Sequence, residues 1–176
     1  MTESFLGDHT DYSGLDAPMF NAAAVSAIRG YCGWHIAPSL VLSGKVGSAG
    51  GKIIRIPALN VTEVAKLALT DGTDLLDGAQ WNAAGLVELA APVEPCLSAI
   101  EYTVVAGFNP DDVPDLITVA LQVSRRAASA PSGTVRSQSV NGASVSYAFS
   151  GSGATSIQLM QDEREILDRY RIARLP

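Results

Sequence analysis

The chain has 176 residues, 47% of them hydrophobic and 17% charged, with a formal net charge of −6 at pH 7. A chain of this length can bury a core without disulfides or a metal, and its composition excludes a disordered acidic or basic tail protein. Because no apolar run reaches the roughly 20 residues that a membrane-spanning helix needs, an integral membrane protein is excluded as well. No secretory signal is visible. Cys32 and Cys96 make no disulfide framework, so a reducing compartment is expected.

The charge is distributed unevenly along the chain. Residues 1–124 carry 5 basic and 14 acidic side chains, a net charge of −9, whereas residues 125–176 carry 7 arginines and 4 acidic side chains, a net charge of +3. This split favours head-to-tail pairing between subunits or with a partner. The alternative is a solvated helix face that holds arginines. The negative total disfavours readout of a nucleic-acid sequence.

We expect residues 1–176 to form a single domain that begins with a polar arm. Residues 1–16 are mostly polar, as is typical of a flexible N-terminal arm. Asp16-Ala17-Pro18 then supplies an N-cap acid and a proline in the first turn. Apolar residues follow at helical spacing, which predicts a first helix over 17–29 that ends at Gly30.

The segment 40–107 has the pattern of a β-rich insertion between helices. Stretches of β-forming residues alternate with turn signals, of which Asp71-Gly72 is the best short hairpin signal. Their spacing of about ten residues predicts a small antiparallel sheet or sandwich. The candidate strands are Leu40–Ser43, Lys52–Ile56, Glu63–Thr70, Asp74–Leu76, Gly85–Leu89 and Ala99–Ala106.

After this insertion the chain returns to helix. The acids and prolines between Asn109 and Asp115 suit a helix N-terminus, and a continuous apolar face predicts a helix over 112–129. Residues 130–156 are rich in serine, glycine and alanine, and are expected to form a flexible hairpin or loop. A C-terminal helix and tail over 157–176 complete the chain, with a D-x-x-E capping pattern at the start of the helix, Asp162 to Glu165.

These elements predict an α+β fold in which a small helical core, made of the N-terminal, central and C-terminal helices, carries an inserted antiparallel β region. The C-terminal helix has one narrow apolar seam. An isolated helix of this length is marginal in water, so the seam must pack on the 112–129 helix of the same chain or on another chain. Arginines at the end of the helix can pair with carboxylates of that surface. The seam consists of Leu159, Glu163, Ile166, Leu167 and Tyr170, and the arginines are Arg169, Arg171 and Arg174.

Few residues of the chain are suited to catalysis or metal binding. Cys32 and His35 lie three apart in an irregular stretch, which rarely yields a nucleophile and its base, and the cysteines and histidines match no zinc spacing. The glycine-rich segment 47–52 departs from the phosphate-binding loop at both ends, and Asp111 and Asp112 lack the loop of a calcium site. On its residues alone the chain is expected to be a non-enzymatic interaction protein with no cofactor and no metal.

Three stretches of the sequence resemble a known family. They are Tyr31-Cys32-Gly33-Trp34-His35-Ile36-Ala37-Pro38, Pro110-Asp111-Asp112-Val113-Pro114 at the start of the central helix, and Leu167-Asp168-Arg169-Tyr170-Arg171 near the end. In this order, over roughly residues 17–175, the chain resembles the head-to-tail connector (adaptor) proteins of long-tailed phages that infect actinobacteria.

The resemblance implies a structural virion protein, assembled in the host cytoplasm and located at the head–tail junction, or neck. It implies a homo-oligomeric ring, typically of twelve copies, between the portal protein and a head–tail stopper or tail-completion protein. DNA would pass through the lumen without specific binding, and no membrane is involved. The candidate residues for the portal or subunit interface are Ile166, Leu167, Arg169, Tyr170, Arg171 and Arg174. The alternative is a small non-catalytic protein-binding module with a β-sandwich recognition surface.

Overall fold

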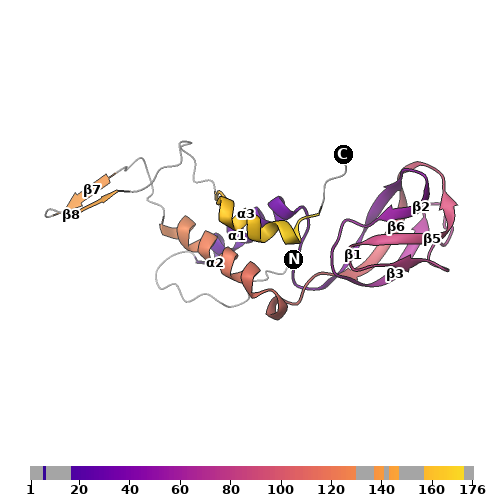
Figure 1. Ribbon diagram of the computed structural model, residues 1–176, viewed down its shortest axis with the longest axis horizontal. Coiled ribbons are helices and arrows are strands. Elements are labelled where there is room, and N and C mark those ends of the chain that lie inside the picture. The colour runs from indigo at the N-terminus through magenta and orange to yellow at the C-terminus, as the bar shows by residue number, and fades with distance from the viewer. Residues whose placement is uncertain (1–5, 7–16, 130–136, 141–142, 147–156, 173–176) are drawn as a thin grey trace.

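The computed structural model describes residues 6, 17–129, 137–140, 143–146 and 157–172. Its helices are α1 (Ala17–Cys32), α2 (Pro114–Ser129) and α3 (Gln161–Leu167), with the 3-10 turns η1 (Pro110–Asp112) and η2 (Asp168–Tyr170). Its strands are β1 (Leu40–Ser48), β2 (Gly51–Arg55), β3 (Val61–Leu69), β4 (Gln80–Trp81), β5 (Leu86–Val93), β6 (Cys96–Ala106), β7 (Ser137–Val140) and β8 (Ala143–Ser146). The three helices lie side by side, and β1–β6 form a β region next to them (Figure 1), so the expected α+β fold is confirmed.

α1 runs further than its sequence pattern predicts. Gly30 lies inside the helix, and the residue that ends it is Gly33, whose φ is +83° and whose N–H donates to the carbonyl of Arg29 at 2.8 Å. A left-handed residue after the last turn is a common helix stop, and glycine adopts it without strain. The prediction that the helix ends at Gly30 is therefore wrong.

The β region consists of two three-stranded antiparallel sheets, with strand orders β1-β6-β3 and β2-β5-β4. On β6, Ile100, Val104 and Ala106 are fully buried, and the residues between them are only partly so. These side chains share one hydrophobic cluster with Ile54 and Val87 of the second sheet. Each sheet thus turns one face inward and leaves the other to solvent, as alternating strand patterns predict.

Several strand bounds differ from those expected. β1 and β6 are longer, the short strand β4 was not predicted, and the candidate strand at 74–76 reduces to an isolated bridge between Ala68 and Asp74. The turn at Asp71-Gly72 is confirmed, since Gly72 N–H donates to the carbonyl of Leu69 at 2.9 Å. Only one bridge follows it because the chain bends away after two residues, where Leu76 N–H donates to the side chain of Asp74 at 2.8 Å.

Two short segments, residues 33–39 and 107–109, join the helices to the β region, and we call them the connector. Phe108 N–H in the second segment donates to the carbonyl of Ile36 in the first at 2.9 Å. Gly107 has a φ of +120°, and a Cβ there would lie 2.7 Å from the carbonyl oxygen of Pro38. The two segments therefore approach too closely for any residue but glycine at that position. Arg29 of α1 secures the first segment by donating to the carbonyls of His35 and Ala37, each at 2.8 Å.

The central helix begins later than expected. η1 occupies Pro110–Asp112, and α2 starts at Pro114, because Asp112 and Val113 N–H donate in the 3-10 pattern to Asn109 and Pro110. The expected buried face is present and packs on α1. Between the two helices, Ser124 donates its hydroxyl to the side chain of Asn21 at 2.6 Å in a buried contact.

Two predicted flexible segments lie mostly outside the described residues. Of the hairpin or loop expected over 130–156, the structure describes β7 and β8, which pair antiparallel with Val140 opposite Ala143. Of the arm expected over 1–16, it describes Leu6, which is buried. The end of the tail, 173–176, is not described either. The expectations of flexibility and of a single domain stay predictions.

Candidate docking surface

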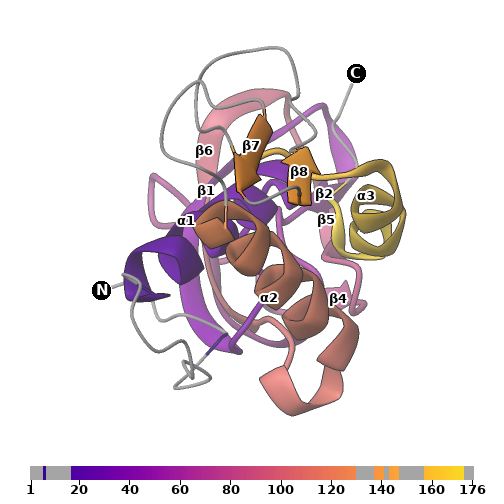
Figure 2. The same ribbon diagram turned by 90° about the vertical axis from the view of Figure 1, so that its left-hand side faces the viewer.

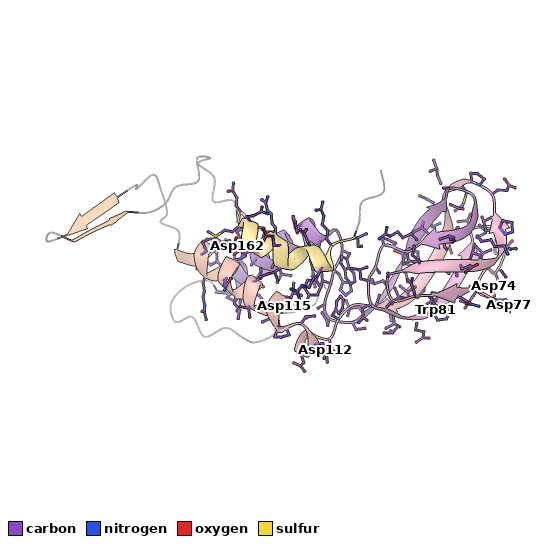
Figure 3. The ribbon with its side chains drawn as sticks, in the orientation of Figure 1. Asp74, Asp77, Trp81, Asp112, Asp115 and Asp162 are labelled. Atoms are coloured by element: carbon purple, nitrogen blue, oxygen red, sulfur yellow. The ribbon has the colours of Figure 1, made fainter. Side chains whose placement is uncertain are left out.

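The described candidate interface residues lie on α3, on η2 and, in the case of Arg171, directly after η2. These elements pack beside α2 and against the C-terminal end of α1. α1, α2 and α3 with η2 make one helical layer, in which α1 and α3 run toward the connector and α2 runs away from it (Figure 1). Figure 3 shows Asp115 and Asp162 on this layer, and Asp74 and Asp77 at the far end of the β region.

Tyr170 and Leu167 belong to the interior of the chain. Leu167 is fully buried and Tyr170 is 6% exposed. Trp34 donates its indole N–H to the carbonyl of Tyr170 at 2.6 Å, and the rings of Phe108 and Tyr170 meet edge-on with centroids 5.4 Å apart. The phenol of Tyr170 donates to Asp115 at 2.7 Å. The sequence left open whether the apolar seam packs on its own chain or on another chain. Leu167 and Tyr170 pack on their own chain, against its helices and its connector.

Cys32 is also taken up by this packing. Its thiol donates to the carbonyl of Leu167 at 3.7 Å, and its own carbonyl accepts the N–H of Ile172 at 3.0 Å. Burial raises the pKa of the Cys32 thiol to about 12. His35 donates through Nε2 to the carbonyl of Pro38. A protonated, buried thiol is a poor nucleophile, so this arrangement gives Cys32 and His35 structural contacts and no catalytic geometry.

An ion pair between Arg126 and Glu163 fixes the start of α3 on α2. The two N–H···O distances are 2.6 and 2.9 Å, and Glu163 is 5% exposed. Burial by itself raises the pKa of Glu163, but hydrogen bonds from Arg126 and from the Met160 N–H outweigh it and hold that pKa below its ordinary value. The helix thus begins after Met160 and is capped by Glu163; the expected capping by Glu165 is wrong because Arg126 positions Glu163 instead.

The outer side of α3 and η2 carries the charged candidates. The side chain of Arg169 is 61% exposed and lies 3.1 Å from Asp115, and that of Arg171 is 41% exposed and lies 3.7 Å from Asp168. Tyr31 donates to Asp168 at 2.6 Å. Both arginines therefore pair with carboxylates of their own chain, while more than half of the Arg169 side chain and about two-fifths of the Arg171 side chain remain accessible. Ile166 is half-buried, and Arg174 lies outside the described residues.

Sequence reasoning missed three residues that build this surface: Trp34, Phe108 and Arg126. No local pattern identifies them, since their partners are between 37 and 136 positions away in the chain. A buried acid in an apolar seam was the one available signal. Glu163 at such a position requires a cation, and the basic residues of 125–176 are the nearest source.

Other features of the described residues do not suggest a different site. They contain no group of three His, Cys, Asp or Glu side chains placed to hold a metal ion. No described helix is long and apolar enough to cross a membrane. On the outer face of the first sheet, Glu101 is paired with Lys45 at 3.0 Å and Lys66 at 2.8 Å, and hydrogen bonds from both lysines lower its pKa to about 2.

Comparison with known proteins finds solved structures that share the fold of this chain. No protein-family model and no curated protein sequence matches the chain. A chain in the neck of an empty gene transfer agent (GTA) particle, computed with C6 symmetry, is 17% identical over 97% of this chain and 88% of that chain, with a TM-score of 0.57. A chain in the neck of a native GTA particle, computed with C12 symmetry, is 17% identical with the same coverage and a TM-score of 0.52. A chain in the virion of a native GTA particle is 16% identical over 99% and 89% of the two chains, with a TM-score of 0.54.

Proposed function

We propose that this protein is a structural neck component of a phage-like particle: an adaptor whose copies form a ring between the capsid portal and the tail or stopper protein. The observation that carries the proposal is the shared fold over 97% of the chain with chains from GTA necks, one of them computed with C12 symmetry. The sequence resemblance to connectors of phages that infect actinobacteria supports the same role independently. The genome passes through the lumen of the ring.

A role in the virion without catalysis agrees with the chemistry of the described residues. Cys32 is a buried thiol with its pKa raised to about 12, and His35 is engaged by a backbone carbonyl. The candidate docking surface instead offers exposed arginines at the end of a well-anchored C-terminal segment. Guanidinium groups suit bidentate pairing with carboxylates of a partner.

Within this role, we assign portal docking to the accessible end of the C-terminal segment. Arg169 and Arg171 form its described charged part; along the chain Ile166 precedes them and Arg174 follows them. Leu167 and Tyr170 contribute from the interior, because their burial fixes the position of the segment. The ring itself requires heterologous contacts between copies. The acidic part of the chain, residues 1–124, and the basic part, residues 125–176, carry opposite net charges that suit such contacts.

Microscopy of the purified protein mixed with its portal tests the ring directly. We expect a ring of defined rotational symmetry attached to the portal at low salt. A mixture that shows neither co-migration nor a ring on the portal contradicts the proposal.

A charge-reversal variant tests the docking residues. The double variant R169E/R171E should bind the portal at least tenfold more weakly, a loss of about 1.4 kcal/mol. The matched control is K52E, which makes the same kind of change on the exposed residue Lys52 of the β region and should alter the affinity less than about twofold. Far-ultraviolet circular dichroism checks that both variants fold. Equal affinity for the R169E/R171E variant and the original chain would place the docking site elsewhere.

A further inference from the structure

The exposed face of α1 carries no charged side chain. Its exposed described residues are Pro18, Met19, Ala22, Ser26 and Gly30, and the last four recur at intervals of three and four, so they share one stripe of the helix. A helix face that meets water normally carries charged or strongly polar residues. Met19 is 65% exposed at one end of this stripe. We call the stripe of Met19, Ala22, Ser26 and Gly30 the α1 face.

Gly30 supplies a second observation at the α1 face. It has a helical backbone, and a Cβ built there would have no heavy atom of the described chain within 4 Å. A glycine inside a helix destabilises it relative to alanine, and nothing in the described chain requires glycine at this position. A glycine here is accounted for if the backbone of another helix approaches closely.

A third observation lies on the opposite side of the helical layer. Met160 is 56% exposed at the start of α3, and it and Met19 are the two large exposed hydrophobic residues on the described helices and their caps. Figure 2 shows the N-terminal part of α1 on one flank of α2 and α3 on the other. Because α1 and α3 both run toward the connector, their first turns lie at the same end of the layer, away from the β region (Figure 1).

We propose that the α1 face is a subunit contact: it packs against the α3 flank, around Met160, of a second copy of this chain. This inference rests on the proposed ring, which requires each copy to present two different surfaces to its neighbours. Copies placed side by side in the same orientation bring Met19 of one to the level of Met160 of the next. The uncharged stripe then packs against Met160, and Gly30 lets the backbone of the neighbouring helix approach.

The size of the contact indicates when it forms. A helix of 16 residues is about 24 Å long, so one helix face is smaller than the roughly 800 Å² per partner of a standard stable interface. The contact is therefore weak between two free chains and becomes stable when a ring closes or a template holds the copies. Measurement must then use a high concentration or a covalent trap.

Disulfide trapping tests the contact. Met19→Cys and Met160→Cys are made separately in a Cys96→Ser background, since Cys96 is partly accessible and Cys32 is buried. The two proteins are mixed at millimolar concentration with a mild oxidant and run on a non-reducing gel. We expect the mixed dimer to exceed either homodimer by at least fivefold. A single chain that carries both cysteines should form a ladder of multimers.

Leu97→Cys is the matched control, because Leu97 is 96% exposed on the β region and reports random collision. A mixed dimer no more abundant than the Met19→Cys/Leu97→Cys product overturns the inference. So does a predominant Met19→Cys homodimer, which indicates a symmetric contact, or cross-linking of Met19→Cys to the portal. A Met19→Cys thiol that does not react with a small reagent also overturns it, since residues 1–16 of the same chain would then cover the face.

Substitution of Gly30 gives a readout that is separate from cross-linking chemistry. Gly30→Ala and Gly30→Leu should melt at the same temperature as the original chain or a few degrees higher, because each removes a helix glycine. Gly30→Leu should lower the yield of the mixed dimer at least tenfold, whereas Gln122→Leu on the exposed side of α2 should not. An unchanged yield with Gly30→Leu overturns the close approach. If a ring forms on the portal but no mixed dimer is trapped, the proposed function is supported and this subunit contact is wrong. If the mixed dimer is trapped but no ring forms, the contact is supported and the proposed ring is wrong.

Discussion

The indole N–H of Trp34 donates to the backbone carbonyl of Tyr170 at 2.6 Å, across 136 positions of sequence. This hydrogen bond ties the connector to the last described turn of the chain. The phenol of Tyr170 in turn reaches Asp115 at the start of α2. One aromatic pair thus holds three parts of the fold together: the connector, the central helix and the C-terminal segment.

Trp34→Phe should destabilise the protein by about 2 kcal/mol, because it keeps a ring in place but leaves a buried carbonyl without its donor. The free energy of unfolding from urea titration measures this. Trp81→Phe serves as the control, since Trp81 is 40% exposed and its substitution should cost less than about 0.5 kcal/mol. Equal effects of the two substitutions would show that the hydrogen bond to Tyr170 contributes nothing.

Arg126→Ala should cost about 2 kcal/mol, because it leaves the carboxylate of Glu163 buried without its partner. This is less than for a fully enclosed pair, since the side chain of Arg126 is 34% exposed. Arg164→Ala on the exposed side of α3 should stay within about 0.5 kcal/mol of the original chain. The double variant R126A/E163Q should recover part of the loss, and a cycle of these variants in urea measures the coupling. Additive effects would contradict a direct interaction.

The stability of the connector should depend on pH through His35. Burial lowers the pKa of His35 below 6.5, and the nearby charge of Arg29 lowers it further, against an opposing hydrogen bond to Pro38. Because the folded chain binds the proton less readily than the unfolded one, the contribution of His35 is complete above pH 6.5 and is lost as the pH falls below that value. His35→Gln should therefore flatten the decline of unfolding free energy as the pH falls below 6.5. Parallel pH profiles for the two proteins would exclude this role.

Gly107→Ala should cost about 3 kcal/mol, because both the backbone angle and the carbonyl of Pro38 oppose a side chain there. Gly51→Ala separates these two causes. Gly51 has a φ of +99° but no neighbour within 4 Å of a Cβ position, so its substitution should cost only about 1 kcal/mol for the backbone. Thermal unfolding of both variants measures the difference. Similar losses would mean that the connector segments can separate without cost.

The sequence predicted the structural elements that are determined by the spacing of nearby residues. The three helices, the antiparallel β region and the turn at Asp71-Gly72 all follow from periodicity and turn chemistry, which act between residues close in the chain. The inward direction of Glu163 follows from spacing too. Spacing does not identify the cation that compensates the buried charge of Glu163, because Arg126 is 37 positions away in the chain.

The errors in the predicted bounds have a common physical cause. Glycine permits a left-handed backbone but does not require it, so the presence of Gly30 does not by itself end the helix. The tertiary contacts of the connector, which Arg29 organises, select Gly33. The length of β1 was likewise underestimated, because its glycines are covered by a neighbouring strand: the ring of Tyr102 lies over Gly44.

The pairing of Leu40 with Ala106 has a consequence for how such a chain can change. The first residue of β1 and the last of β6 are direct neighbours, about 5 Å apart as antiparallel partners are. The chain therefore enters and leaves the β region at one point. A short loop between these two positions would span the distance, so insertions or deletions within the β region need not change the path of the chain through the helices.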